Sequence, residues 1–176
     1  MKFQAVPLTG AYVIELEPHE DHRGFFARAF CQAEFEEQGL PTEIKQSNLS
    51  CNRCKGTLRG LHYQVQPHYE AKLIRVIRGA VFDVIVDVRP DSHTCCQWFG
   101  VKLQAEEHKA LFVPGGVAHG FLTLADETLI YYEMFENYHP ESARGVRYND
   151  SAFEIRWPDE IKIISEKDQH WPDFSH

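Results

Sequence analysis

Five side chains that can carry chemistry lie on otherwise apolar segments of this chain: Arg59, His62, Lys72, His119 and Tyr132. Histidine is the natural base near neutral pH, a phenol can donate a proton, and a lysine ammonium can stabilise an oxygen that gains negative charge. Gathered in one pocket, these groups suit removal of a proton next to a ketone and its return on the opposite face. We therefore expect a racemase or an epimerase that grips an anionic substrate.

Strand periodicity predicts that several of these side chains face an interior. Lys72 is two residues from Ile74 and therefore shares its strand face. His119 and Tyr132 likewise share strand faces with apolar residues of their own segments. An ammonium is costly in an apolar interior unless it pairs with an acid or with a substrate anion. A single histidine or tyrosine in a strand is more often a core residue, so the hypothesis depends on their convergence.

Arg59 and His62 lie on opposite faces of a regular strand, because side chains alternate with a period of two. Both reach one pocket only if Gly60 bends the strand, or if one of them serves a neighbouring subunit. Arg23, which precedes Gly24, is a second candidate for gripping phosphate, since a guanidinium matches phosphate oxygens with two donors. The alternative for Arg23 is an exposed loop charge.

Composition fits a single globular domain over residues 1–176. The chain has 176 residues, of which 43% are hydrophobic and 12% aromatic. Its formal net charge of -8 argues against nucleic acid or a membrane surface as partner, because proteins usually bind both through a positively charged surface. An anionic small molecule remains compatible, since local arginines decide its binding.

The cysteines and the N-terminal segment favour a cytoplasmic protein. Residues 1–9 contain no apolar run typical of a signal peptide, and no later segment reaches membrane-spanning length. The five cysteines are an odd number, which favours reduced thiols. Cys51 and Cys54 have the spacing of a zinc knuckle but lack a second ligand pair, so we interpret them as solvated loop thiols.

Alternating apolar and polar residues predict many short strands and one helix. Strands are expected over 12–16, 25–30, 43–50, 57–64, 71–78, 81–88, 98–103, 110–113, 117–124 and 128–135, and a helix over 31–38. This spacing is typical of an all-β, antiparallel jelly-roll sandwich or barrel with few short helices. The tail after Asp150 is expected to strap Trp157 and Trp171 against it.

The sequence resembles the dTDP-4-dehydrorhamnose 3,5-epimerase family of nucleotide-sugar enzymes. The similarity covers nearly the whole chain and rests on segments 21–26, 46–48, 56–64, 71–73, 81–84, 114–121 and 165–168, in the family's order. The resemblance implies a cupin-type jelly roll that works as a homodimer without a metal or other cofactor. It also implies a nucleotide-diphosphate sugar substrate, whose ketone at carbon 4 acidifies carbons 3 and 5.

The resemblance implies a role for each matching residue. His62 matches the family's base, Asp168 its carboxylate partner, Tyr132 the acid on the opposite face, and Lys72 the residue beside the ketone. Seven further residues match substrate-binding positions of the family: Arg23, Phe26, Gln46, Asn48, Arg59, His119 and Tyr138. Of these, Tyr138 matches a position at the nucleotide end of the site.

Two departures from the family pattern concern the nucleotide end of the site. This chain has Arg28 and Ala143 where the family usually has acidic residues. A CDP-linked sugar is therefore an alternative to a dTDP-linked one, and epimerisation of carbon 3 alone, or a keto-isomerase reaction, is an alternative to inversion of both carbons. A non-catalytic jelly roll that binds sugar nucleotides is a further alternative, but it would need the arginines without the acid and base.

A metal is not expected in the catalytic pocket. Metal-binding cupins use a His-x-His pair, whereas His62 is followed by Tyr63 and Gln64. His62, His68, Glu70 and His119 form a possible ligand set on paper, but His68 and Glu70 lie in a loop that contains a proline.

Overall fold

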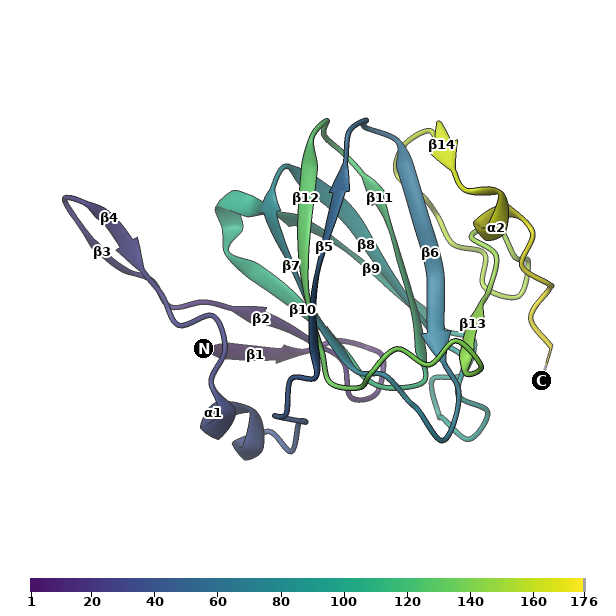
Figure 1. Cartoon of the computed structure of the whole chain (residues 1–176), viewed down its shortest axis with the longest axis horizontal. Helices are drawn as coiled ribbons and strands as arrows, with labels where there is room; N and C mark the ends of the chain where they lie inside the picture. The colour runs from purple at the N-terminus through teal and green to yellow at the C-terminus, as the bar shows by residue number, and fades with distance from the viewer. Residues whose placement is uncertain (176) are drawn as a thin grey trace.

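The computed structural model describes residues 1–175 and places most of its strands in two sheets (Figure 1). The first sheet has the order β1 (Lys2–Ala5), β2 (Tyr12–Glu15), β10 (Lys109–Val113), β7 (Lys72–Arg78), β12 (Thr128–Met134) and β5 (Gln46–Asn52). The second has the order β13 (Ala143–Gly145), β6 (Thr57–Gln64), β11 (Val117–Thr123), β8 (Ala80–Asp87) and β9 (Trp98–Gln104). The all-β jelly-roll prediction is confirmed.

The main core lies between the two sheets and follows the predicted alternation. Ile74 and Ile130 of the first sheet meet Ile85, Val117 and Phe121 of the second in one buried cluster. Burial of these side chains on one face of each strand is the main force that holds the sheets together. Lys72, His119 and Tyr132 share the faces of these residues, so they enter the same interior, as predicted.

The outer face of the first sheet is covered by α1 (Gln32–Glu37) and its flanking segments. The helix inserts Phe35, which is fully buried, against Ile14, Leu73 and Phe112. The helix predicted over 31–38 is thus confirmed, and η1 (Ala105–Glu107) is a single short 3-10 turn before β10.

The C-terminal tail crosses the outer face of the second sheet. Trp157 meets Phe82 edge to face with ring centroids 6.3 Å apart, and Trp171 packs against Gly145, as the predicted strap requires. Between them, β14 (Ile163–Ile164) pairs with β6 in parallel, which departs from the expected antiparallel pattern. The short helix α2 (Glu166–Gln169) follows, and the Ser165 hydroxyl caps it by accepting from the Asp168 N–H.

A small hairpin forms an arm that projects from the body (Figure 1). It consists of β3 (His19–Asp21) and β4 (Gly24–Phe26), joined by a tight turn in which Gly24 has a φ of 128°. The strand predicted over 25–30 is wrong in extent, because only residues 24–26 pair and the following segment turns toward α1. Among the described residues, no helix combines the length and the apolar character that a membrane span requires.

Candidate active site

A continuous cleft opens between the two sheets. It consists of two adjoining cavities of about 490 and 530 Å³ that share Asn48, His62, Lys72 and Met134. Strands β5, β7 and β12 form one wall, strands β6 and β11 form the other, and the segment β14–α2 closes one side. The cleft is large enough for a sugar and part of a nucleotide.

A bulge at Gly60 brings Arg59 and His62 into this cleft. His62 pairs with His119 of β11 while Arg59 pairs with Phe121, so β6 has one more residue than β11 between these two pairs. Gly60 has a φ of 114°, and a Cβ there would lie 2.5 Å from the Gly120 Cα. The bend at Gly60 therefore resolves the conflict between the two side chains within one chain.

His62 and Asp168 form a dyad at the mouth of the cleft. The His62 Nε2 lies 2.6 Å from the Asp168 Oδ1, and the other carboxylate oxygen accepts from the Gly60 N–H at 3.2 Å. Burial alone would raise the pKa of Asp168, but these hydrogen bonds outweigh burial and hold that pKa below its ordinary value. An ionised carboxylate only accepts, so Nε2–H donates and Nδ1 keeps the lone pair of a base.

Tyr132 lines the same cleft from β12, which belongs to the opposite sheet from His62. Burial and the nearby Asp83 carboxylate both raise the pKa of Tyr132, outweighing the opposite effect of Arg59. The phenol is therefore protonated at neutral pH and has a proton to donate. His62 and Tyr132 thus stand on facing walls of the cleft.

Lys72 is held in the cleft by an ion pair with Glu70 that residue patterning did not identify. Its Nζ lies 2.8 Å from the Glu70 Oε1, and both side chains are buried. A buried ammonium needs such a partner to offset its lost hydration. Lys72 lies, with His62 and Asn48, in the part of the cleft that lines both cavities.

A second dyad joins His119 to Asp83, at 2.8 Å between Nε2 and Oδ1. Asp83 is fully buried, and its Oδ2 has no hydrogen-bond partner within the described residues. Residue patterning did not identify Asp83, which alternates with Val81 and Ile85 and shares their inner face in the structure. A charged residue on an inner strand face is the signal that reveals such a partner.

The remaining predicted binding residues divide between the two cavities. Arg59 and His119 line the first cavity, where the Arg59 Nε donates to Asn52 at 2.7 Å. Gln46 and Tyr138 line the second, where the Tyr138 N–H donates to the Gln46 Oε1 at 2.7 Å.

The second cavity is also lined by Arg144, Lys167 and Trp171, which were not predicted as site residues. The Lys167 ammonium lies 5.1 Å from the centroid of the Trp171 ring, which in turn contacts His62 edge to face. Ala143, the second departure from the family pattern, also lines this cavity. These residues give this end of the cleft aromatic surface and positive charge.

Arg23 and Phe26 line neither cavity of their own chain. Both lie on the β3–β4 arm, where the Arg23 side chain is 79% exposed and paired with Asp21, and Phe26 is 76% exposed. Arg28 lies at the base of the arm and pairs with Glu34 at 3.1 Å. The structure thus separates the arm residues from the other predicted site residues within one chain.

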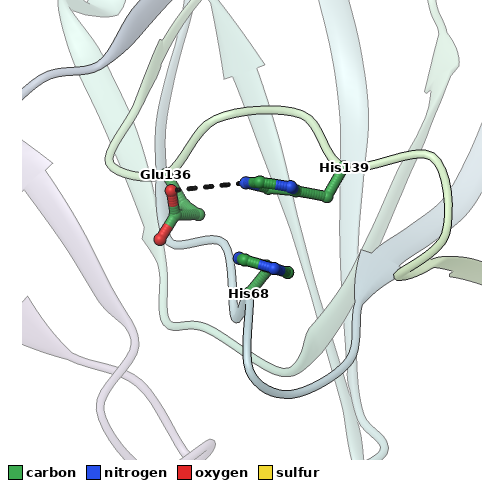
Figure 2. A group of neighbouring side chains, drawn as sticks. All are labelled: His68, Glu136 and His139. Atoms are coloured by element: carbon green, nitrogen blue, oxygen red, sulfur yellow. Dashed lines mark ion pairs between the residues drawn. The ribbon is translucent and has the colours of Figure 1, made fainter.

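The possible metal ligands considered from the sequence, His62, His68, Glu70 and His119, do not come together in this fold. Within residues 1–175, one group of His, Cys, Asp and Glu side chains is close enough to share an ion, and it consists of His68, Glu136 and His139 (Figure 2). None of these three lines the cleft.

Comparison with known proteins agrees with this geometry. Residues 5–176 match the family model described as dTDP-4-dehydrorhamnose 3,5-epimerase. The enzyme of that name from Methanothermobacter thermautotrophicus is 44% identical over 173 residues, which cover 97% of this chain and 92% of the relative.

Solved structures extend the similarity to the fold. The dTDP-4-dehydrorhamnose 3,5-epimerase of Elizabethkingia anophelis superimposes with a TM-score of 0.95 at 40% identity, covering 99% of this chain and 96% of that one. The Bacillus anthracis enzyme, solved with TDP and PPi bound, gives 0.94 at 40% identity, covering 98% and 99%. The chain therefore belongs to the dTDP-4-dehydrorhamnose 3,5-epimerase family.

Proposed function

We propose that this protein is an isomerase that inverts carbons 3 and 5 of dTDP-4-dehydro-6-deoxyglucose to give dTDP-4-dehydrorhamnose. The observation that carries the proposal is the placement of the His62–Asp168 dyad and Tyr132 on facing walls of one cleft, with Lys72 between the sheets. A binding module needs the arginines of this cleft but not a base and an acid that face each other.

The residues of the cleft suit each step of the reaction. The Nδ1 of His62 removes the proton next to the ketone, and the Lys72 ammonium stabilises the enolate oxygen that forms. The Asp168 carboxylate stabilises the imidazolium, and Tyr132 delivers a proton to the opposite face of the carbon. Before the second carbon reacts, His62, whose side chain is 46% exposed, returns its proton to water, and the half-buried Tyr132 phenolate regains a proton from water.

The reaction is tested by incubation in deuterium oxide followed by mass spectrometry of the sugar. Deuterium at carbons 3 and 5 is the expected result with the dTDP-linked 4-keto-6-deoxy sugar. Deuterium at carbon 3 alone would identify a 3-epimerase, an activity named among the relatives. Exchange only with a CDP-linked sugar would mean a different base preference, and no exchange with either would contradict the epimerase.

We further propose that the protein is a homodimer in which the β3–β4 arm of one chain completes the cleft of the other. This arrangement accounts for Arg23 and Phe26, which are exposed on the arm and yet match substrate-binding positions. The guanidinium would add a phosphate contact and the phenylalanine an aromatic surface for the base.

Complementation between variants tests the shared site. Co-expressed Arg23→Ala and His62→Ala chains should regain activity, because a mixed dimer contains one cleft with both residues intact. A mixture of Lys72→Ala and His62→Ala chains is the matched control and should stay inactive, since both residues belong to the same cleft. No recovery in the first mixture, or full activity of a monomer, would contradict the proposal.

A further inference from the structure

A group of potential metal ligands, His68, Glu136 and His139, lies outside the catalytic cleft, where two loops meet (Figure 2). His68 comes from the β6–β7 loop, and Glu136 and His139 come from the segment that follows β12. One potential ligand atom of each lies within 4.8 Å of those of the other two. All three residues are half-buried, so an ion from solvent can reach them.

A buried amide fixes the two loops relative to each other. The Gln64 Nε2 donates to the backbone oxygens of His68 and Asn137, both at 3.1 Å. Its Oε1 accepts from the His139 N–H at 2.6 Å. Gln64 is 2% exposed, so the backbone positions of both histidines are set by one interior group. Hydrogen bonds of this kind hold the backbone of both loops in place, which a binding site formed by two loops requires.

The histidine on the second loop is oriented as a metal ligand usually is. Its Nδ1 lies 3.3 Å from the Glu141 Oε1, so Nδ1–H donates to that carboxylate and Nε2 keeps its lone pair. This lone pair is on the side of Glu136, with 3.9 Å between Nε2 and Oε1. A carboxylate that fixes the tautomer of a ligating histidine is the common outer partner in metal sites.

The two imidazole rings are stacked, with centroids 3.5 Å apart and planes within 10° of parallel. Lone pairs of parallel rings do not converge, so coordination of one ion requires one ring to turn about its Cβ–Cγ bond. Glu141 holds His139, and therefore His68 is the ring that turns.

We propose that His68, Glu136 and His139 bind a divalent transition metal, with Zn²⁺ as the best match, and that the ion ties the two loops together. Two imidazole nitrogens and one carboxylate oxygen are a frequent zinc ligand set, which leaves the fourth position to water. The site differs from the metal-free catalytic pocket that the sequence predicted. Tyr138, which lines the cleft, precedes one of the ligands directly.

Zinc titration of the intact protein tests the proposal by calorimetry. The protein is used untagged, stripped with a chelator and with its thiols alkylated, because cysteine thiols also bind zinc. Wild type should bind one Zn²⁺ per chain, and its melting temperature should rise with zinc. His68→Ala and His139→Ala should lose this site, and Glu141→Gln should bind about 10- to 100-fold more weakly.

The exposed His93→Ala is the matched control and should bind like wild type. Glu136→Gln provides a test that does not alter either ring, and it should also weaken binding. Circular dichroism of each variant establishes that it is folded before titration. The proposal would be overturned if wild type bound no stoichiometric zinc, or if folded His68→Ala and Glu136→Gln bound it as wild type does.

Discussion

Replacement of Asp168 by Asn should slow turnover by about 10- to 100-fold while the substrate still binds. Asp168 is 4% exposed, and its carboxylate accepts two hydrogen bonds, from the His62 Nε2 and from the Gly60 N–H. Asparagine offers one oxygen for these two donors, and it carries no charge to stabilise the imidazolium. A hydrogen bond to a charged group contributes about 1.5–3 kcal/mol. Loss of that amount from the transition state corresponds to the stated range of rates.

The assay is the initial rate of product formation across substrate concentrations, which separates kcat from KM. We expect kcat to fall and KM to stay within a few-fold, because Asp168 acts through His62 and does not grip the phosphates. Asp159→Asn is the matched control, since that carboxylate forms a surface ion pair with Lys55 outside the cleft. An unchanged kcat in Asp168→Asn would refute the assignment of the dyad, and a large rise in KM alone would mean that Asp168 is a binding residue.

Three further predictions concern the acid, the bulge and a turn remote from the site. Tyr132→Phe should permit deuterium exchange at carbon 3 without inversion, since the acid on the opposite face is lost; inverted product at the normal rate would contradict this. Gly60→Ala should cost at least about 2 kcal/mol in urea unfolding, because its Cβ would lie 2.7 Å from the His119 O at a φ of 114°; wild-type stability would contradict it. Although burial opposes it, hydrogen bonds from Arg89, Ser92 and Thr94 lower the pKa of Asp87 from 3.8 to about 2. Asp87→Asn should therefore lose about 2 kcal/mol at pH 7, and the difference from wild type should vanish as pH falls from about 4 toward 2; a difference independent of pH would be inconsistent with this linkage.

Local alternation predicted the strands well because each has one face against a core. The predicted limits of the segments now seen as β6, β8 and β12 agree with the structure within one residue at each end. The arm was misjudged because Phe25 and Phe26 have the composition of a buried strand, yet both are exposed in this chain. Burial by another molecule leaves the same pattern in a sequence as burial within the chain.

The position of single site residues was predictable from the alternation of residues in strands, whereas their partners were not. Alternation placed Lys72, His119 and Tyr132 in the interior, but it did not identify Asp83 or Glu70 as their partners. Such pairs depend on how strands from distant parts of the chain come together, which alternation does not encode. The stacking of His68 on His139 depends in the same way on the meeting of two loops.

The most direct test of the account is the rate of deuterium incorporation at carbon 3 by His62→Ala, measured beside calorimetric binding of dTDP. A loss of about 100- to 10,000-fold is expected, since a general base contributes that much, with binding within a few-fold of wild type. Exchange at the wild-type rate in a folded His62→Ala protein would contradict the claim that His62 is the base of this cleft.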